Sequence, residues 1–287
     1  MGTEARLLVV TNDPQAGEAA LLRAARDLEE TEHALSRFED DSDLGRLNRS
    51  GRAVPGERLL AALRAAIYAY EWSDGLLDPR VIGSLEPSGY RDGIPDTVVE
   101  EAGQVGPLSP VDMRTWIGGP KIAVPSGVRL DLAEVAKALG IGWAAAHLAG
   151  HAGLLVDVGG DVVALGADEE GEPWSVAVAH QQIVGQFTGS RLAIATSTTT
   201  RRALTVAGGK AAHYLIDPRT GAPSGGDILF ATVAAPTILE ADLAAKLLII
   251  LGKAALRRLD ERCRILVTDH RNRTSLLDAK DSTKVGR

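Results

Sequence analysis

The chain has 287 residues, 45% of them hydrophobic, and carries 31 Lys and Arg against 38 Asp and Glu, a formal net charge of −7. This length is enough to bury a sizeable core, and an acidic chain with no clustered basic run is unsuited to neutralising the phosphates of nucleic acid. The single cysteine, Cys263, excludes a disulfide framework and a multi-cysteine metal site. We interpret Cys263 as a small, semi-buried apolar side chain.

The first half of the chain predicts one strand, two helices and a long irregular stretch. A strand is expected at Ala5–Thr11. A helix should run from Asp13 towards Phe38, because Asp followed by Pro is typical of an N-cap and first helical position. A second helical pattern begins at Pro55 and ends before Gly75. Residues 76–124 are broken by Gly and Pro and predict loops with short helices.

The second half predicts many short strands. A strand at Val128–Asp131 should meet a helix over Leu132–Ala149. Further strands, bounded by turn residues, are expected at Leu154–Val158, Val162–Leu165, Ser175–Ala179, Leu192–Thr196, Leu204–Ala207, His213–Ile216 and Ile228–Ala234. Strands outnumber helices but are interleaved with them. This predicts an α+β fold with a mainly antiparallel sheet packed with helices.

The last third contains one clearly marked helix. Thr237 and Glu240 have the spacing of a capping box, in which each side chain satisfies a backbone N–H group of the other residue. The apolar pattern continues to Gly252, and a second helix and a closing strand at Arg264–Thr268 should follow.

No segment approaches the roughly 20 apolar residues needed to span a bilayer, so we expect no membrane span. The sequence from Met1 enters an apolar run without a basic region or a small-residue cleavage site. As written, the chain is therefore expected to be cytoplasmic.

Two glycine patterns need separate interpretations. Gly140, Gly142 and Ala145 have the spacing of a dinucleotide fingerprint, but they lie inside an expected helix and not between a strand and a helix. We interpret them as close-packing positions and reject a Rossmann site. Gly159 and Gly160 follow an expected strand, where they form either a tight turn or a close backbone approach to a ligand.

Two polar patterns each allow a structural and a functional interpretation. The turn formers from Asp217 to Pro223 make a turn, and their polar groups would also hold a loop rigid around a ligand. Asp242 and Lys246 lie four apart on the capped helix. They form either an ordinary surface ion pair, worth about 0.2–0.5 kcal/mol, or a site in which Asp242 offers hard oxygen to Mg²⁺.

Taken in order, these segments resemble the ApbE flavin-transferase family over nearly the whole chain. The segments that carry the resemblance are 1–3 (MGT), 36–48 (SRFEDDSDLGRLN), 75–79 (GLLDP), 131–137 (DLAEVAK), 155–161 (LVDVGGD), 194–197 (IATS), 213–221 (HYLIDPRTG) and 240–242 (EAD). The resemblance implies one T-fold-like domain over residues 1–287, or two intimately joined lobes, with an FAD cleft between lobes. Relatives in this family often act outside the cytoplasm.

The implied activity is the transfer of FMN from FAD to a Thr or Ser hydroxyl of an acceptor protein, with release of AMP. The alternatives are an FAD-binding protein without catalysis and an FAD pyrophosphatase that yields FMN and AMP. The implied metal is Mg²⁺, held by the Ala136 carbonyl and the Asp242 carboxylate. The implied FAD contacts are Met1, Phe38, Leu76, Leu77, Asp78, Ala133, Leu139, Ile216 and Ala245.

The chain departs from the family pattern at several of these positions. Ala133 and Glu134 replace a double glycine, Gly142 replaces a later Asp, and Tyr214 replaces a His. The most consequential departure is Lys246, which stands where the family has a metal-ligating Thr. An ammonium has no lone pair for Mg²⁺. We expect Asp242 and Lys246 to be the catalytic residues. Lys246 should either contact the FAD phosphate or pair with Asp242. Because its ammonium cannot bind Mg²⁺, the chain should need Mg²⁺ only at millimolar concentration or not at all.

Overall fold

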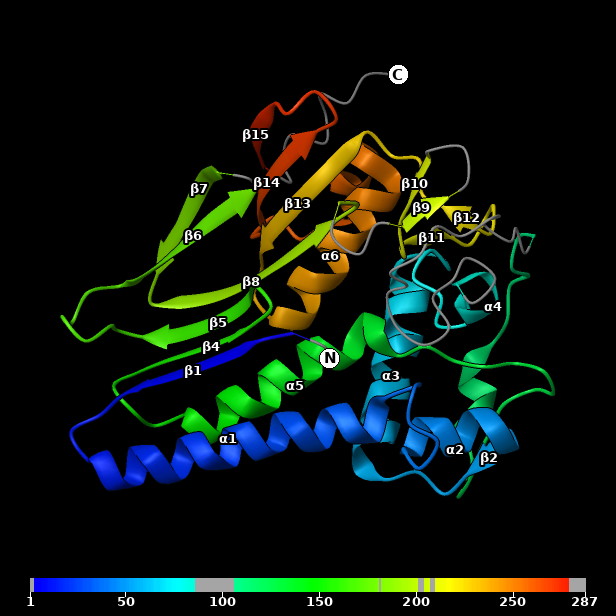
Figure 1. Ribbon diagram of the computed structural model, residues 1–287, viewed down its shortest axis with the longest axis horizontal. Coiled ribbons are helices and arrows are strands. Elements are labelled where there is room, and N and C mark those ends of the chain that lie inside the picture. Colours follow the sequence, from blue (N-terminus) through cyan, green and yellow to red (C-terminus); the bar gives the residue numbers. More distant parts are fainter. Residues whose placement is uncertain (1–2, 86–105, 181, 201–203, 207–209, 279–287) are drawn as a thin grey trace. The chain divides into compact units, whose positions relative to one another are not determined.

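The computed structural model describes residues 3–85, 106–180, 182–200, 204–206 and 210–278 (Figure 1). The chain divides into two compact units. The first unit consists of Met1–Glu32, Lys137–Ser197 and Asp227–Arg287, and the second of His33–Ala136 and Thr198–Gly226. The structure combines helices with a large antiparallel sheet, which confirms the predicted α+β class.

A seven-stranded sheet organises the first unit, in the order β1-β4-β5-β8-β13-β14-β15 (Figure 1). Its strands are β1 (Ala5–Val10), β4 (Gly153–Val158), β5 (Asp161–Gly166), β8 (Arg191–Thr198), β13 (Ile228–Ala234), β14 (Arg264–Asp269) and β15 (Thr274–Asp278). β1 pairs with β4, β4 with β5, β5 with β8, β13 with β14, and β14 with β15, all antiparallel. The predicted strand Arg264–Thr268 is confirmed as β14, but β15 follows it, so the expectation that it is the last strand is wrong.

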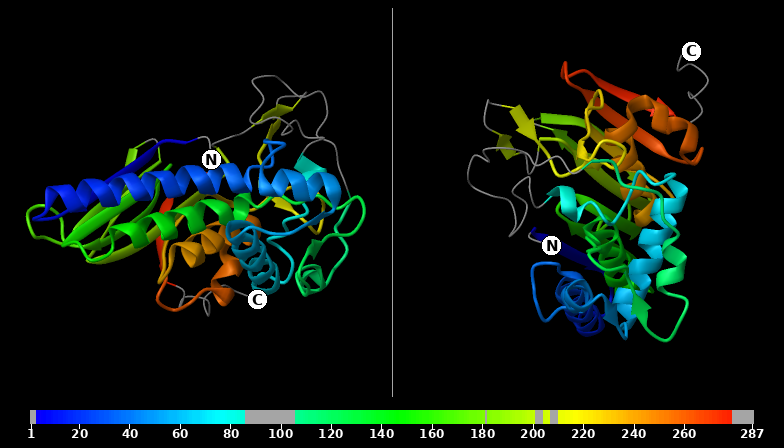
Figure 2. Two further views of the ribbon diagram at one scale, coloured as in Figure 1. Left: turned by 90° about the horizontal axis from the view of Figure 1, so that it is seen from below. Right: turned by 90° about the vertical axis from the view of Figure 1, so that its right-hand side faces the viewer.

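One face of this sheet packs against helices. These are α1 (Pro14–Leu35), α5 (Ala133–Leu148) and α6 (Ile238–Leu251), and α1 and α5 run side by side (Figure 2). Their buried side chains form one apolar cluster with alternate residues of β4, β5 and β8. In β5, Val163 faces this cluster. The two-residue period of a strand therefore sends Val162 and Ala164 to the opposite face.

The opposite face is covered by a hairpin of β6 (Trp174–His180) and β7 (Gln182–Gly189). Trp174, Val178 and Phe187 pack there against Ile194 and Phe230. The sequence predicted β6 but not β7, whose glycines and polar residues hide the alternation expected of a strand.

The second unit is built from one longer helix and several short elements. They are α2 (Asp43–Ser50), β2 (Arg52–Ala53), α3 (Glu57–Trp72), α4 (Ile82–Leu85), the 3₁₀ turn η1 (Met113–Trp116), β3 (Ile122–Ala123), β9 (Leu204–Val206), β10 (Lys210–Ala212), β11 (Ile216–Asp217) and β12 (Ala222–Pro223). Leu44, Leu59, Leu130 and Leu132 are fully buried. As expected, the described part of residues 76–124 is mostly loop.

Two predicted strands of this unit are wrong. Val128–Asp131 forms no strand, because the Leu130 backbone bonds to the Asn48 side-chain amide at 2.8 Å in both directions. In the segment His213–Ile216, only Ile216 joins a strand. The His213 ring and the Leu215 carbonyl instead bond the backbone of Ser224, at 3.0 and 2.9 Å.

The predicted helices agree with the structure apart from their ends. α1 ends at Leu35, three residues before Phe38. α6 has the predicted capping box at Thr237 and ends at Leu251, with Gly252 as its C-cap. The 3₁₀ helix η2 (Gly252–Arg258) then takes the place of the expected second helix. In the described part of the chain, no helix combines the length and the apolar character of a membrane span.

The two glycine patterns fall where the sequence placed them. Gly140 and Gly142 lie inside α5, which agrees with the rejection of a dinucleotide fingerprint. Gly159 and Gly160 have φ values of 64° and 93° and form the two-residue turn between β4 and β5. A Cβ on Gly159 would lie 2.5 Å from Thr3 Oγ1, so this turn requires glycine both for conformation and for space.

Candidate active site

Helix α6 carries a buried ion pair. Lys246 Nζ lies 2.5 Å from Asp242 Oδ1, and the two residues are 5% and 1% exposed. The interpretation as a surface pair is therefore wrong. Every residue of α6 from Ala241 to Ile250 is buried, so the Asp242 and Lys246 side chains have no route to solvent. Breaking such a pair leaves a buried uncompensated charge, which costs far more than losing a surface pair.

The second carboxylate oxygen of Asp242 has no partner comparable to the Lys246 ammonium on Oδ1. Asp242 Oδ2 is buried and, among the described residues, accepts no hydrogen bond. A buried carboxylate oxygen without a donor is costly and marks a position where a cation or a donor would bind favourably.

A second Asp–Lys pair lies in the same unit, and its carboxylate is buried. Asp161, at the start of β5, is 1% exposed, and its Oδ2 lies 2.5 Å from Lys137 Nζ on α5. Its Oδ1 accepts the Thr196 N–H at 2.9 Å. Burial raises the pKa of the Asp161 carboxyl, Lys137 opposes this rise, and the Asp242 carboxylate adds to it.

Neither Lys137 nor Asp161 was singled out from the sequence as a site residue. Both lie in segments that resemble the ApbE pattern, and Asp161 directly follows the Gly159-Gly160 turn. That turn holds the start of β5, and with it the Asp161 carboxylate, in a fixed place.

The second unit contains a buried ion pair that contacts the face of an exposed aromatic ring. Arg37 Nε lies 3.0 Å from Asp131 Oδ2, and both side chains are largely buried. Asp131 Oδ1 accepts the Ala133 N–H at 2.9 Å, at the start of α5. The Arg37 guanidinium lies 4.2 Å from the centroid of the Phe38 ring, and Phe38 is 55% exposed. Two predicted FAD contacts, Phe38 and Ala133, are thus held by one ion pair.

Two Asp-Pro-Arg turns in the second unit share one geometry. In the first, Arg80 Nε and its backbone N–H each donate to Asp78 Oδ1 at 2.9 Å, and an Arg80 terminal nitrogen donates to Oδ2 at 2.6 Å. The matching distances between Arg219 and Asp217 are 2.9, 2.9 and 2.7 Å. Each carboxylate therefore accepts a two-pronged contact from an arginine two residues later, which fixes the loop.

The charge state of Asp217 depends on this contact. Burial raises the pKa of the Asp217 carboxyl, but the hydrogen bonds and charge of Arg219 outweigh burial and hold it below 3.8. The stability that Asp217 contributes is thus complete above the unfolded-state value of 3.8 and is lost as the pH falls through the lower folded-state value.

We expect Arg219→Met to raise the pKa of Asp217, because burial then acts without opposition. Carboxyl ¹³C chemical shifts followed by NMR across acidic pH should show the Asp217 transition moving to higher pH. The matched control is Arg262→Met, which removes the same kind of contact from Asp260 and should leave the Asp217 transition in place. An unmoved Asp217 transition in Arg219→Met would contradict this electrostatic account.

The remaining predicted site residues are divided between the units. Leu76, Leu77, Ala136 and Ile216 are buried in the second unit, and Ala245 is buried in the first. Leu139 lies in the first unit and is partly buried. Met1 lies outside the described residues. The role of each of these residues in binding FAD stays a prediction.

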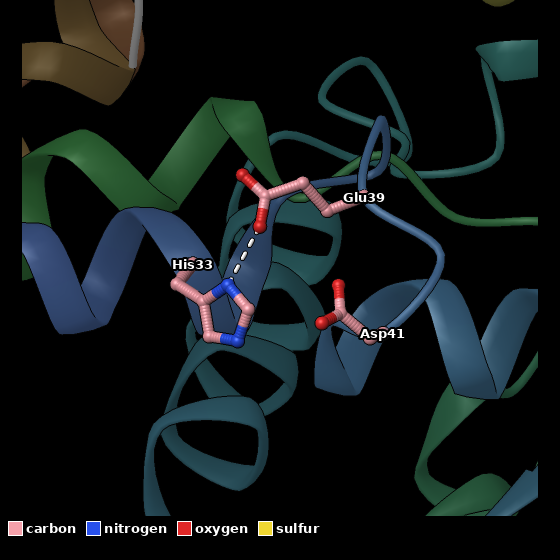
Figure 3. Close-up of side chains that lie close together, drawn as sticks. All are labelled: His33, Glu39 and Asp41. Carbon is pink, nitrogen blue, oxygen red and sulfur yellow. Dashed lines mark hydrogen bonds and ion pairs between the residues drawn. The ribbon is translucent and has the colours of Figure 1, made fainter.

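One cluster of titratable side chains was not expected from the sequence. It lies at the C-terminal end of α1 and in the loop that leads to α2. His33 Nδ1 is 2.6 Å from Glu39 Oε2, and Asp41 points toward them, with one potential ligand atom from each of the three side chains within 4.8 Å of the others (Figure 3). The His33 and Glu39 side chains are 57% and 44% exposed. An exposed His–Glu pair accounts for this contact without a metal.

The model of the ApbE family matches residues 1–267. The chain belongs to the ApbE family. A relative from Klebsiella pneumoniae, named FAD:protein FMN transferase, is 28% identical over 264 residues, which cover 84% of this chain and 74% of the relative.

Solved structures of ApbE proteins have the same fold. The flavin transferase ApbE of Vibrio cholerae superposes with a TM-score of 0.75 at 22% identity, covering 99% of this chain and 96% of that one. The ApbE protein of Thermotoga maritima superposes with a TM-score of 0.76 at 20% identity, covering 96% and 94%. The structure described above is therefore the ApbE fold, and the buried Asp242–Lys246 pair lies within the part that matches the ApbE family model.

Proposed function

We propose that this chain transfers FMN from FAD to a Thr or Ser hydroxyl of an acceptor protein and releases AMP. The observation that carries the proposal is the ApbE family match over residues 1–267, which spans every predicted site residue. The Klebsiella pneumoniae relative named FAD:protein FMN transferase supports the same reaction.

The reaction is a phosphoryl-type transfer. The acceptor hydroxyl oxygen forms a bond to the FMN phosphorus and releases its proton to solvent. The bond from that phosphorus to the bridging pyrophosphate oxygen breaks, and AMP leaves with that oxygen. Negative charge builds on the phosphate oxygens, so a fixed positive group near them lowers the barrier. In this proposal Lys246 supplies that positive charge, and Asp242 holds its ammonium in place at 2.5 Å.

The flavin and adenine parts of FAD need apolar and aromatic surfaces. The predicted contacts include Phe38, whose exposed ring packs with one face against the Arg37 guanidinium. A planar ring supported by a buried guanidinium suits stacking on a planar heterocycle. In this proposal Phe38 stacks on FAD, and the Asp78 turn keeps the neighbouring loop rigid.

The predicted magnesium ligands fit Mg²⁺ only in part. Asp242 Oδ2 is buried without a hydrogen bond and would suit a cation. The other oxygen of the same carboxylate already carries the Lys246 ammonium. The charge of Asp242 is therefore compensated before any metal arrives, which does not fit a tightly held Mg²⁺. The proposed transfer accordingly includes no step through a metal.

The same pair favours a second candidate, a protein that binds FAD without cleaving it. If the fixed ammonium does not replace a divalent cation in catalysis, FAD would bind and remain intact. Hydrolysis of FAD to FMN and AMP, with water as the acceptor, is a further outcome that the same assay detects.

Incubation with FAD in excess Mg²⁺, read by mass spectrometry, tests the proposal. We expect AMP to appear, and we expect a candidate acceptor protein to gain the mass of one FMN joined through a phosphodiester. AMP and free FMN without any covalent flavin would indicate a pyrophosphatase. Bound but intact FAD would indicate the non-catalytic protein. A chain that shows no change in flavin fluorescence on titration would contradict all three, and NAD serves as the control nucleotide.

A further inference from the structure

The first unit contains two Asp–Lys ion pairs, and in the pair on α6 both side chains are buried. Lys246 Nζ lies 2.5 Å from Asp242 Oδ1, and Lys137 Nζ lies 2.5 Å from Asp161 Oδ2. The Asp242 carboxylate also contributes to the raised pKa of the Asp161 carboxyl. Two carboxylates and two ammonium groups sum to a formal charge of zero.

A neutral ion pair is a poor host for a divalent cation. Mg²⁺ binds oxygen ligands at roughly 2.0–2.1 Å and is usually held through one or two carboxylates whose charge is free to act on it. At Asp242, a cation on Oδ2 would share one small carboxylate with the ammonium on Oδ1. The two positive charges would repel strongly at that separation, and the burial of both side chains reduces the screening by water.

Lys246 also cannot move aside into water. It is 5% exposed and lies on a helix that is buried on nearly every side. An ammonium displaced from Asp242 would stay buried and lose its charged partner, which is strongly unfavourable. A metal would therefore have to bind next to Lys246 rather than replace it.

We infer that Lys246 determines how this chain uses cations, by occupying with its own ammonium the carboxylate on which a divalent cation would otherwise bind. The inference rests on the proposed function only for the identity of the substrate, since the competition between Lys246 and a metal concerns Asp242 alone. Removing the ammonium should convert Asp242 into a metal ligand.

Manganese serves as the probe, because free and bound Mn²⁺ are distinguished by electron paramagnetic resonance and Mn²⁺ accepts the oxygen ligands that Mg²⁺ prefers. The proteins compared are the unmodified chain, Lys246→Thr, Lys246→Gln and Lys253→Thr, all without FAD. Lys253 is an exposed lysine beyond the end of α6, so its replacement removes the same charge without touching the pair. Lys246→Gln removes the charge but keeps an N–H group that can donate to Asp242. It replaces Lys246→Thr in the comparison if Lys246→Thr does not fold.

We expect the unmodified chain and Lys253→Thr to bind Mn²⁺ only at millimolar concentration, and the Lys246 variants to bind at least about tenfold more tightly. Mn²⁺ should also raise the melting temperature of the Lys246 variants but not that of the other two proteins. Micromolar binding by the unmodified chain, or folded Lys246 variants with unchanged affinity, would overturn the inference. FAD fluorescence titrations of the same samples test the proposed function separately, because the Mn²⁺ result does not depend on FAD.

Discussion

Replacing Asp242 with Ala is expected to lower the free energy of unfolding by about 3–5 kcal/mol and to abolish AMP release from FAD. The variant leaves the Lys246 ammonium buried on α6 without the carboxylate that lies 2.5 Å from it. It also removes the group that holds Lys246 in place for the proposed transfer. Chemical denaturation gives the stability, and chromatographic detection of AMP gives the activity.

The double variant Asp242→Ala/Lys246→Met separates these two effects. It removes both charges, so no uncompensated ion remains buried, and a buried pair replaced by apolar groups is often neutral or stabilising. We expect the double variant to regain most of the lost stability and still release no AMP. If the single variant keeps its stability, the pair is not buried in solution. If the single variant keeps its cleavage activity, Asp242 does not belong to the active site.

Replacing Arg37 with Ala is the second change with a large expected effect. It leaves the Asp131 carboxylate without its cation in a largely buried place, which should lower the free energy of unfolding by about 3–5 kcal/mol. It also removes the guanidinium beneath the Phe38 ring, so FAD should bind more weakly. Denaturation and flavin fluorescence titration measure the two effects.

Two further variants show how Arg37 acts. Arg37→Lys keeps a charge for Asp131 but loses the planar guanidinium beside Phe38, so it should recover part of the stability while FAD binding stays weak. Phe38→Leu should leave stability nearly unchanged, because the ring is 55% exposed, and should still weaken FAD binding. Unchanged FAD affinity in Phe38→Leu would remove Phe38 from the predicted contacts.

The elements that the sequence predicted well are those with local signals. The capping box at Thr237 marks the start of α6, and the Asp13-Pro14 pair marks the start of α1. Six of the seven strands of the central sheet were visible as short apolar runs bounded by turns, and β15 was missed. The turn at Asp217–Pro223 was also expected, and the Asp217–Arg219 pair that fixes it joins residues only two apart.

The features that could not be predicted from the sequence depend on contacts between segments far apart in the sequence. Val128–Asp131 has the composition of a strand, but the Asn48 side chain, 82 residues from Leu130, takes the backbone bonds that a neighbouring strand would make. The Arg37–Asp131 pair likewise joins two segments far apart in the sequence. No periodic pattern reports such contacts.

The burial of Asp242 and Lys246 was missed for a related reason. A spacing of four on a helix predicts that the two side chains meet, which is confirmed, but it does not say what surrounds the helix. The available signal was the composition of α6, which is apolar on all sides apart from these residues and Glu240. A helix of that kind is a buried helix, and an ion pair on it is a buried ion pair.

The most direct test of the proposed reaction is the amount of AMP formed from FAD in excess Mg²⁺, measured for the unmodified chain and for Asp242→Ala/Lys246→Met. Our account predicts that the unmodified chain releases AMP and that the folded double variant does not. FAD that stays intact with the unmodified chain, or equal AMP release by the double variant, would contradict it.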